Sequence, residues 1–251
     1  MRALCKLLFF TVLFTASQVT KAAEVHVAVA SNFTAPMKEM STLFEQETGH
    51  KAVLSFGSSG KFLAQINHGA PFDVFLSADQ EKPSILAAAQ GIVANSQFTY
   101  AIGTLVLWSA DASLVIEGPE ALSNIPFNKL ALANPRLAPY GKAALQTLEA
   151  LDRKELTESR WVQGENISQT YHFVASGNAQ IGFVALSQVA ENGDIQTGSG
   201  WVVPSSYYSP IKQDAVILKH AANNEAAHAL IRFLKSPAAH QVIHAYGYSI
   251  E

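Results

Sequence analysis

The sequence predicts an α/β fold of two lobes, each built on a mixed, mostly parallel sheet flanked by helices. Short apolar runs typical of buried strands alternate with segments whose apolar residues recur at helical spacing. The alternation begins at Glu24 and starts again after Ala101, and neither a sequence repeat nor a flexible linker separates the two halves. We therefore expect two extended hinge strands, at 98–106 and 209–216, to join the lobes.

The first half of the chain repeats a unit of strand, turn and helix. The run EVHVAVA at 24–30 alternates apolar and polar residues at its start and then meets Ser31, as a strand does at its end. Pro36 suits the first turn of a helix and Gly49 suits its end, so the apolar residues between them predict a helix. The second unit follows the same logic and its helix ends at Gly69. The further predicted elements are a strand at 52–56, a helix at 62–68 and a strand at 73–77.

The second half holds further apolar runs and helical segments. Because the last strand and helices follow the return crossing, we assign them to the first lobe. The expected domains are residues 23–101 together with 213–251 for lobe I, and residues 102–212 for lobe II. The predicted strands are 105–108, 130–133, 181–186 and 214–219, and the predicted helices are 142–151, 165–175 and a pair within 224–245.

Residues 1–22 have the three parts of a secretory signal peptide. Arg2 and Lys6 give a positive start, residues 7–16 form an apolar run, and a small-residue pattern ends at Ala22. An apolar run of this length is too short to cross a bilayer as a helix. We expect this segment to be cleaved, leaving a soluble, exported protein with no inserted segment.

The composition excludes several classes of protein. Seventeen Lys and Arg residues stand against 20 Asp and Glu, and no basic cluster occurs, which argues against a nucleic-acid-binding protein. Removal of residues 1–22 takes three basic residues away and leaves a net charge of about −6. It also removes Cys5, the single cysteine, so we expect neither a disulfide nor a thiolate metal site in the mature protein.

Four predicted strand-to-helix junctions carry small or hydroxylated residues. They share the carboxyl edge of a parallel sheet, where free backbone N–H groups and the positive ends of helix dipoles favour anions. Each junction alone is more simply an ordinary helix N-cap, and only convergence on one cleft would make a site. Lys61 and Lys142 each follow a glycine at a junction. Their charges could attract an anion from the rim of the cleft, or they could simply be solvated side chains on a first helical turn. The junctions are Ser31-Asn32, Ser58-Ser59, Tyr140-Gly141 and Asn166-Ile167-Ser168.

Signatures of catalysis are weak. Gly60-Lys61 and Gly141-Lys142 lack the earlier glycine and the following Ser or Thr of a phosphate-binding P-loop. The run at 57–60, GSSG, is not a GxSxG nucleophile elbow. His240 and His244 lie four residues apart on a predicted helix, but the third ligand of a zinc site is missing. We expect a binding protein and not an enzyme, with a secreted hydrolase as the enzymatic alternative.

Six segments at or near the junctions resemble a known family. They are AVASNFTAPM (28–37), SFGSSGKF (55–62), GAPFDVFLSADQ (69–80), NPRLAPYGKAAL (134–145), GENISQ (164–169) and IGFVALSQV (181–189). Through them the sequence resembles the periplasmic molybdate-binding proteins of ABC transporters, over essentially residues 24–251 and in the expected order. The run GAPFDVFLSAD is the most specific. The resemblance implies a type II periplasmic-binding-protein fold, in which two lobes close on a tetrahedral oxyanion.

The resemblance also implies a set of ligand-binding residues. Ser31 and Ser59 are expected to give hydroxyl and amide donors, and Tyr140 and Ile167 to give main-chain N–H groups. Some family members place a tyrosine hydroxyl on the ligand at the position of Ala185, so that contact is missing here. The full expected set is Ser31, Asn32, Ser59, Tyr140 and Ile167, with Ser58 and Lys61 as auxiliary residues and Asn32 as the replacement for the missing hydroxyl.

The expected ligand is molybdate, and tungstate is nearly indistinguishable from it. Donors without a carboxylate favour a fully deprotonated dianion over hydrogen phosphate, although sulfate and phosphate stay open as alternatives. An amino acid would require an arginine at a junction, and none is there. We expect no cofactor, with molybdenum entering only as the bound oxyanion. The resemblance implies a monomer in the periplasm whose partner is an inner-membrane ABC permease with its ATPase.

Overall fold

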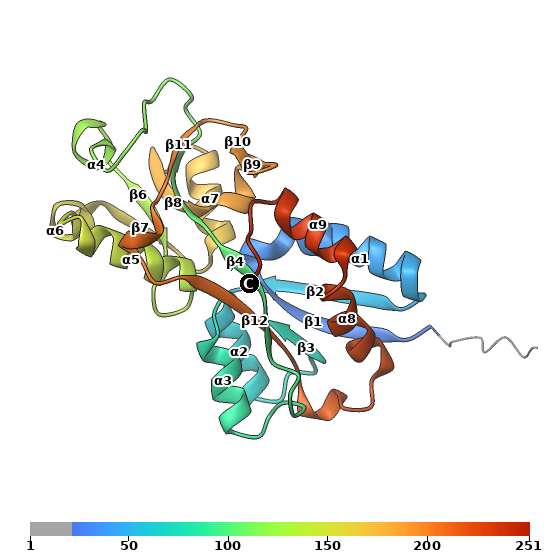
Figure 1. Ribbon diagram of the computed structural model, residues 1–251. Helices are drawn as coiled ribbons and strands as arrows, with labels where there is room; N and C mark the ends of the chain where they lie inside the picture. The colour runs from blue at the N-terminus through green and yellow to red at the C-terminus, as the bar shows by residue number, and fades with distance from the viewer. Residues whose placement is uncertain (1–21) are drawn as a thin grey trace, which may run out of the picture.

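The computed structural model describes residues 22–251 and shows two lobes connected by long strands (Figure 1). The predicted signal peptide, except for Ala22, lies outside the described residues. No helix within residues 22–251 has the length and apolar character needed to cross a membrane.

Lobe I is built on a five-stranded sheet in the order β2-β1-β3-β12-β4. Its strands are β1 (Glu24–Ala30), β2 (Lys51–Gly57), β3 (Val74–Leu76), β4 (Phe98–Gly103) and β12 (Ile211–Ile217). Its helices are α1 (Thr34–Thr48), α2 (Ser59–Asn67), α3 (Glu81–Ala88), α8 (Glu225–Leu234) and α9 (Pro237–Ala245), with short 3-10 turns η1 (Ser31–Phe33) and η5 (Lys219–Ala221).

Lobe II is built on a second five-stranded sheet in the order β11-β5-β8-β6-β7. Its strands are β5 (Leu105–Ser109), β6 (Leu130–Ala133), β7 (Trp161–Gly164), β8 (Ile181–Ala185) and β11 (Ser199–Val202), and a small ribbon pairs β9 (Ala190–Glu191) with β10 (Asp194–Ile195). Its helices are α4 (Ala121–Asn124), α5 (Pro139–Ala150), α6 (Lys154–Thr157) and α7 (Ile167–Ala175), with 3-10 turns η2 (Glu158–Arg160), η3 (Leu186–Gln188) and η4 (Ser205–Tyr207).

The two sheets are mixed and follow the same pattern of strand directions. In lobe I, β1 pairs in parallel with β2 and β3, whereas β12 runs antiparallel to β3 and β4. In lobe II, β6 pairs in parallel with β7 and β8, whereas β5 runs antiparallel to β8 and β11. Parallel and antiparallel pairings are therefore equal in number, and the prediction of mostly parallel sheets was wrong. The antiparallel pairs come from β4, β5 and β12, the strands by which the chain leaves and re-enters lobe I.

Local sequence explains the helix ends and the core of lobe I. Helix α1 ends where Gly49 takes a left-handed conformation with φ of 72°, as its C-cap position favours. Met37, Met40 and Phe44 recur on one face of α1 and are fully buried in the lobe I core. That face packs with β1 and fixes the turn at Ser31, which precedes α1, at the carboxyl end of the strand.

Strands β4 and β12 connect the lobes and pair with each other. The predicted crossings at 98–106 and 209–216 include most of these strands, and the predicted domain limits after 101 and 212 fall inside them. The pairing is irregular between Gln213 and Asp214, because Gln213 pairs with Ala101 and Asp214 with Thr99, which leaves Tyr100 of β4 as the extra residue; the Gln213 side chain is buried. The buried Asp214 carboxylate accepts bonds from Gln97 and Thr99, both at 2.8 Å.

Candidate functional site

A small cavity lies where the two lobes meet. Its volume is about 10 Å³, close to the smallest space that holds a single water molecule. Both lobes line it, at the carboxyl ends of strands and the first residues of helices, as expected for ligand sites in open α/β sheets. The lining residues are Ala30, Ser31, Asn32, Gly57, Ser58, Ser59 and Ala78 from lobe I, and Ala138, Pro139, Tyr140, Asn166 and Ile167 from lobe II.

All five residues of the predicted binding set reach this cavity, as does the auxiliary Ser58, whereas Lys61 does not line it. The convergence of the four junctions follows from the folding of the two sheets toward one another. That these residues bind a ligand stays a prediction, because the cavity wall alone identifies no ligand.

Lobe I contributes serine hydroxyls. The Ser59 Oγ atom accepts a bond from the Ala78 N–H at 2.9 Å, so its hydrogen is free to point into the cavity. Ser58 is the N-cap of α2 and accepts from the Lys61 N–H at 3.4 Å. Within residues 22–251 the Ser31 hydroxyl has no protein partner, although Ser31 is only 5% exposed. Two hydroxyls therefore remain available as donors.

Lobe II contributes the first backbone N–H groups of two helices. Helix α5 begins with Pro139, which has no N–H, so Tyr140 supplies the first one. Helix α7 begins at Ile167, and the Asn166 N-cap side chain accepts from the Gln169 N–H at 3.0 Å and leaves the Ile167 N–H free of that cap. Free N–H groups and the helix dipole make both starts suited to an anion.

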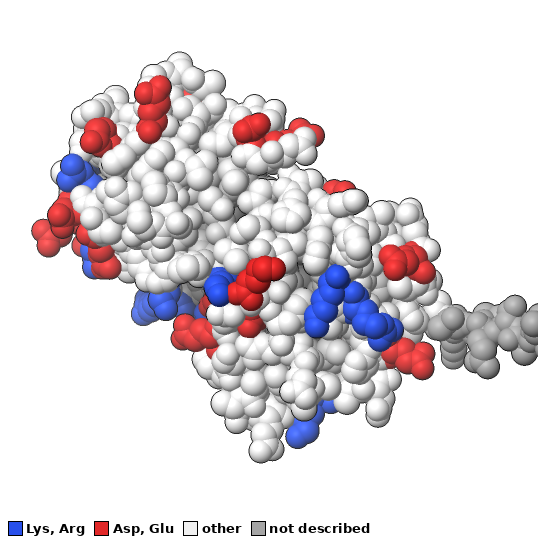
Figure 2. Space-filling model, viewed as in Figure 1, with Lys and Arg blue, Asp and Glu red and all other residues white. Residues whose placement is uncertain are grey.

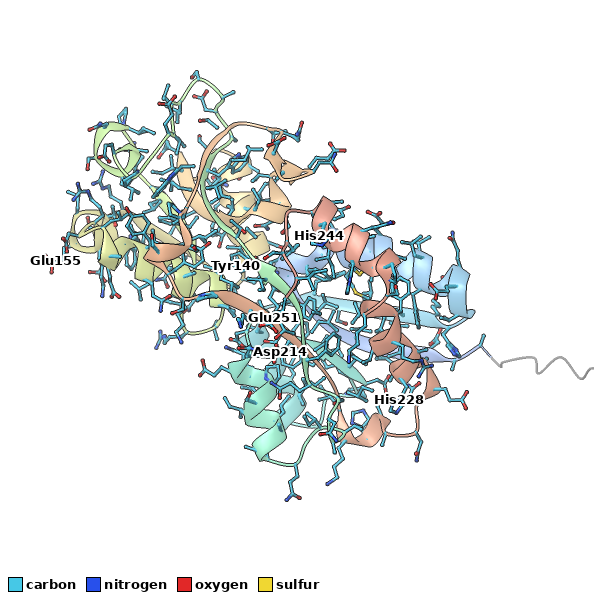
Figure 3. The ribbon with its side chains drawn as sticks, in the orientation of Figure 1. Tyr140, Glu155, Asp214, His228, His244 and Glu251 are labelled. Atoms are coloured by element: carbon cyan, nitrogen blue, oxygen red, sulfur yellow. The ribbon has the colours of Figure 1, made fainter. Side chains whose placement is uncertain are left out.

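The hydroxyl end of Tyr140, which is labelled in Figure 3, reaches Gly103 of β4 and Gln213 of β12, the crossing strands. Its hydroxyl faces the Gln213 amide nitrogen at 3.5 Å. Burial raises the pKa of Tyr140 and Tyr100 well above the usual tyrosine value and that of Tyr248 to about 12. All three phenols therefore keep their hydrogens at neutral pH, and Tyr140 can reach a ligand through its main chain only.

The Asn32 side chain does not fit the role of replacement donor. Its amide nitrogen donates to Gln213 Oε1 at 2.8 Å and to the Tyr248 hydroxyl at 3.0 Å, which uses both hydrogens inside the protein. The expectation that this amide replaces a missing ligand hydroxyl is therefore wrong, because partners far away in sequence already hold it. Ala185, the position of the missing hydroxyl, is fully buried and lies outside the cavity lining.

Sequence reasoning missed Ala78 as part of the site. This residue follows β3 directly and both lines the cavity and orients the Ser59 hydroxyl. The signal was present, since the predicted strand at 73–77 ends at the same sheet edge as the strands before Ser31 and Ser59.

None of the lining residues just given is charged, and the nearby lysines are held by carboxylates. Lys61 Nζ lies 2.5 Å from Glu165 Oε2, and Lys142 Nζ lies 3.7 Å from Glu81 Oε2; both pairs cross between the lobes. Because these side chains are 43–63% exposed, each pair contributes little free energy. Figure 2 shows the same sparseness of charge on the visible face, where most of the surface is uncharged.

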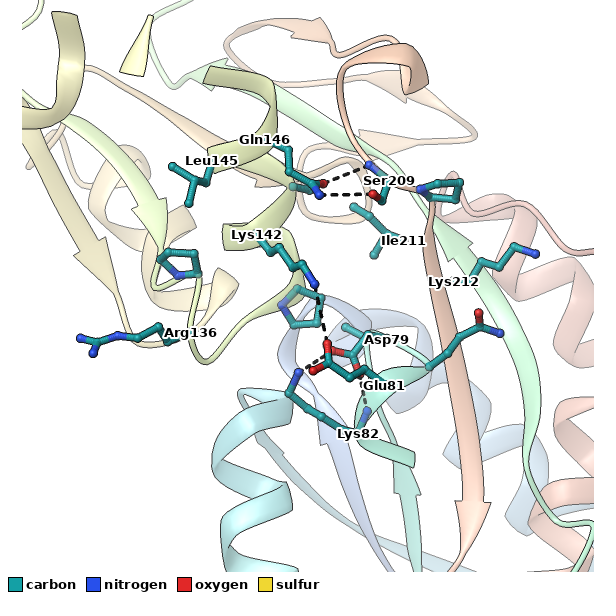
Figure 4. Close-up of a pocket in the computed structure, with 16 residues that line it drawn as sticks. Asp79, Glu81, Lys82, Arg136, Lys142, Leu145, Gln146, Ser209, Ile211 and Lys212 are labelled. Atoms are coloured by element: carbon teal, nitrogen blue, oxygen red, sulfur yellow. Dashed lines mark hydrogen bonds and ion pairs between the residues drawn. The ribbon is translucent and has the colours of Figure 1, made fainter. Parts of the chain in front are cut away.

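A larger groove, of about 520 Å³, runs along the outer side of the lobe junction (Figure 4). Ion pairs and bonds between its walls already satisfy its polar groups, including Lys142 with Glu81 and Gln146 with Ser209. Its paired charges make it a poorer candidate for an anion than the small cavity, whose lining is uncharged. Within residues 22–251 no group of three or more His, Cys, Asp or Glu side chains could hold a metal ion.

Comparisons with known proteins agree with this geometry. Residues 25–249 match the family of bacterial extracellular solute-binding proteins. The molybdate-binding protein ModA of Azotobacter vinelandii is 53% identical over 92% of both chains, and that of Rhodobacter capsulatus is 48% identical over 92% of this chain and 90% of the relative. A solved structure of the Azotobacter vinelandii periplasmic molybdate-binding protein superposes with a TM-score of 0.86 at 40% identity, covering 90% of this chain and 99% of that one. The chain therefore belongs to the family of bacterial extracellular solute-binding proteins, together with its ModA relatives.

Proposed function

We propose that this protein captures molybdate, and tungstate equally, in the cavity between its lobes and delivers the ion to an ABC transporter. The observation that carries the proposal is a small cavity lined from both lobes by hydroxyls and helix-start N–H groups and by no charged side chain. Hydrogen bonds to a charged partner contribute about 1.5–3 kcal/mol each, so several of them can compensate a buried dianion. The ModA relatives support molybdate as that dianion.

The residues that line the cavity also favour fully deprotonated anions over anions that carry a proton. Hydrogen phosphate carries a proton that requires an acceptor, and none of the lining residues has a carboxylate. A fully deprotonated tetrahedral dianion fits better. Sulfate meets that condition as well and is the alternative ligand, separated from molybdate by its smaller size.

Isothermal titration of residues 23–251 tests the proposal. We expect tight binding of sodium molybdate and sodium tungstate, weak binding of sulfate, and none of phosphate or glutamate. Tight sulfate binding without molybdate binding would refute it. As a variant, Ser31→Asp should abolish binding because it places a negative charge against the anion, whereas retained affinity would put Ser31 outside the site.

The cellular part of the proposal follows from the relatives and the N-terminal sequence. We infer export through cleavage of residues 1–22, a monomeric binding protein in the periplasm, and docking of the closed lobes on an inner-membrane permease with its ATPase. N-terminal sequencing of the exported protein should begin at Ala23. Molybdate-dependent stimulation of the cognate transporter's ATPase activity in liposomes tests delivery, and its absence would contradict it.

A further inference from the structure

Two serine hydroxyls of lobe II donate to backbone carbonyls of lobe I across the cleft. Ser168 Oγ, on α7, donates to the Ser31 carbonyl at 3.0 Å. Ser187 Oγ, on η3, donates to the Asn32 carbonyl at 2.9 Å. Neither serine lines the cavity, yet both bonds end on residues that do. The two hydroxyls thus contact main-chain atoms of lining residues without lining the cavity themselves.

The chemistry of the peptide unit connects these bonds to the ligand side. The Ser31 carbonyl and the Asn32 N–H belong to one peptide, so a donor on the carbonyl oxygen polarises the group and strengthens its N–H as a donor. The Ser31 carbonyl is also held by the Thr34 hydroxyl at 2.8 Å, from its own lobe. Of these two bonds to the Ser31 carbonyl, only the one from Ser168 comes from the other lobe, so it exists only while the lobes are closed.

The Ser187 bond is braced by a buried network on the lobe I side. The Tyr248 hydroxyl lies 2.9 Å from Ser187 Oγ and 2.8 Å from the Asn32 carbonyl. The Asn32 amide bonds in turn to Gln213 of β12, whose Oε1 atom also accepts from the Tyr100 hydroxyl at 3.0 Å. Lobe II therefore attaches through Ser187 to a rigid assembly that contains a hinge strand.

We propose that Ser168 and Ser187 are positioning residues that tie anion binding to lobe closure. By bonding the carbonyls of Ser31 and Asn32 from lobe II, they fix this turn in its binding geometry at the moment the lobes meet, and the bond from Ser168 also strengthens the Asn32 N–H. The proposal rests on the proposed function. It assigns to Asn32 a main-chain role at the ligand and a structural role for its side chain.

The expected effects follow from the loss of one hydroxyl donor each. A hydrogen bond of ordinary net strength corresponds to about a 2- to 13-fold change in affinity. We expect Ser168→Ala and Ser187→Ala each to weaken molybdate binding within that range, with the larger effect at Ser187, which is 8% exposed. The change should lie in the dissociation rate, because the bonds form after the anion has entered.

The test uses the single variants, Ser168→Thr as a rescue that keeps the hydroxyl, and Ser176→Ala as a control. Ser176 donates to the His172 carbonyl at 2.6 Å within lobe II and is exposed, so its loss should not change binding. Dissociation of molybdate is followed by stopped-flow tryptophan fluorescence and affinity by titration. Melting of the ligand-free protein shows whether a variant is merely less stable.

The inference is supported if both alanine variants release molybdate faster at an unchanged ligand-free melting temperature, while Ser168→Thr and Ser176→Ala behave as the parent. Parental dissociation rates in both alanine variants, or a fall in ligand-free stability with unaltered binding, would overturn it. If the parent protein does not bind molybdate, the proposed function is refuted, and this inference with it. That outcome is seen in the parent protein alone, so it is distinguishable from a failure of this inference.

Discussion

Gly60 should set how closely the lobes approach each other. It is the second residue of α2, in lobe I, and its N–H donates to the Leu137 carbonyl of lobe II at 2.9 Å. A Cβ atom added there would lie 3.0 Å from both the Cα and the carbonyl oxygen of Leu137. Gly60→Ala therefore presses one backbone against another, and neither can rotate away.

The Gly60→Ala substitution should raise the free energy of lobe closure and leave the folding of lobe I intact. The backbone of Gly60 lies outside the left-handed region, so alanine suits it, and in a helix alanine is favoured over glycine by about 1 kcal/mol. In the closed protein, by contrast, residue 60 and Leu137 must move apart by a few tenths of an ångström to admit the added methyl group. Overpacking of this kind costs about 1–3 kcal/mol. We expect molybdate affinity to fall roughly 5- to 150-fold while ligand-free stability is unchanged or slightly raised.

Titration calorimetry and thermal melting with and without sodium molybdate measure both quantities. Gly118→Ala is the matched control, because nothing lies within 4 Å of its added Cβ and its φ is not positive. If Gly60→Ala binds molybdate as tightly as Gly118→Ala, the contact with Leu137 is no part of the bound state. If the melting temperature of ligand-free Gly60→Ala falls instead, the added methyl group clashes within lobe I and not between the lobes.

Three further outcomes are expected. Ser59→Ala removes a hydroxyl donor and should weaken molybdate binding by about 1.5–3 kcal/mol in titration calorimetry. Lys61→Gln breaks only an exposed pair with Glu165, so the affinity should change less than about fivefold, and a loss above tenfold would place the lysine charge at the ligand. The buried Tyr248, with a pKa of about 12, keeps its proton above pH 10 where the unfolded chain loses it, so stability should fall between pH 10 and 12. Tyr248→Phe should flatten that fall in denaturant titrations by roughly 1.4 kcal/mol per pH unit.

Much of the fold and the cavity wall could be predicted because the signals are local. Strand β6 has the predicted bounds, and α1 ends at the predicted glycine. The junctions at Ser59, Tyr140 and Ile167 could be placed at the carboxyl ends of strands because strand and helix patterns alternate there, although they belong to two sheets. Helix α3 was not predicted: its sequence, EKPSILAA, has weak helical periodicity, and its burial against lobe I comes from tertiary packing.

The inner arrangement of the site could not be predicted, because its contacts join distant parts of the chain. The Asn32 amide meets Gln213 and Tyr248, which are 181 and 216 residues away. An asparagine beside a ligand-binding serine looks the same in sequence whether it faces the cavity or the core. Its direction follows from its bonds to Gln213 and Tyr248, and no local pattern identifies partners so far away in the chain.

These contacts bear on how an acidic protein selects an anion. The mature chain carries about −6, so long-range attraction is absent and the lining itself is neutral. Donors fixed at helix starts distinguish ligands by geometry, and molybdate differs from sulfate mainly in size. The size of the cavity depends on how far the lobes close, which is limited by the Gly60–Leu137 bond and by Ser168 and Ser187. Selectivity between these dianions should therefore depend on interlobe contacts behind the cavity wall at least as much as on the residues that touch the ion.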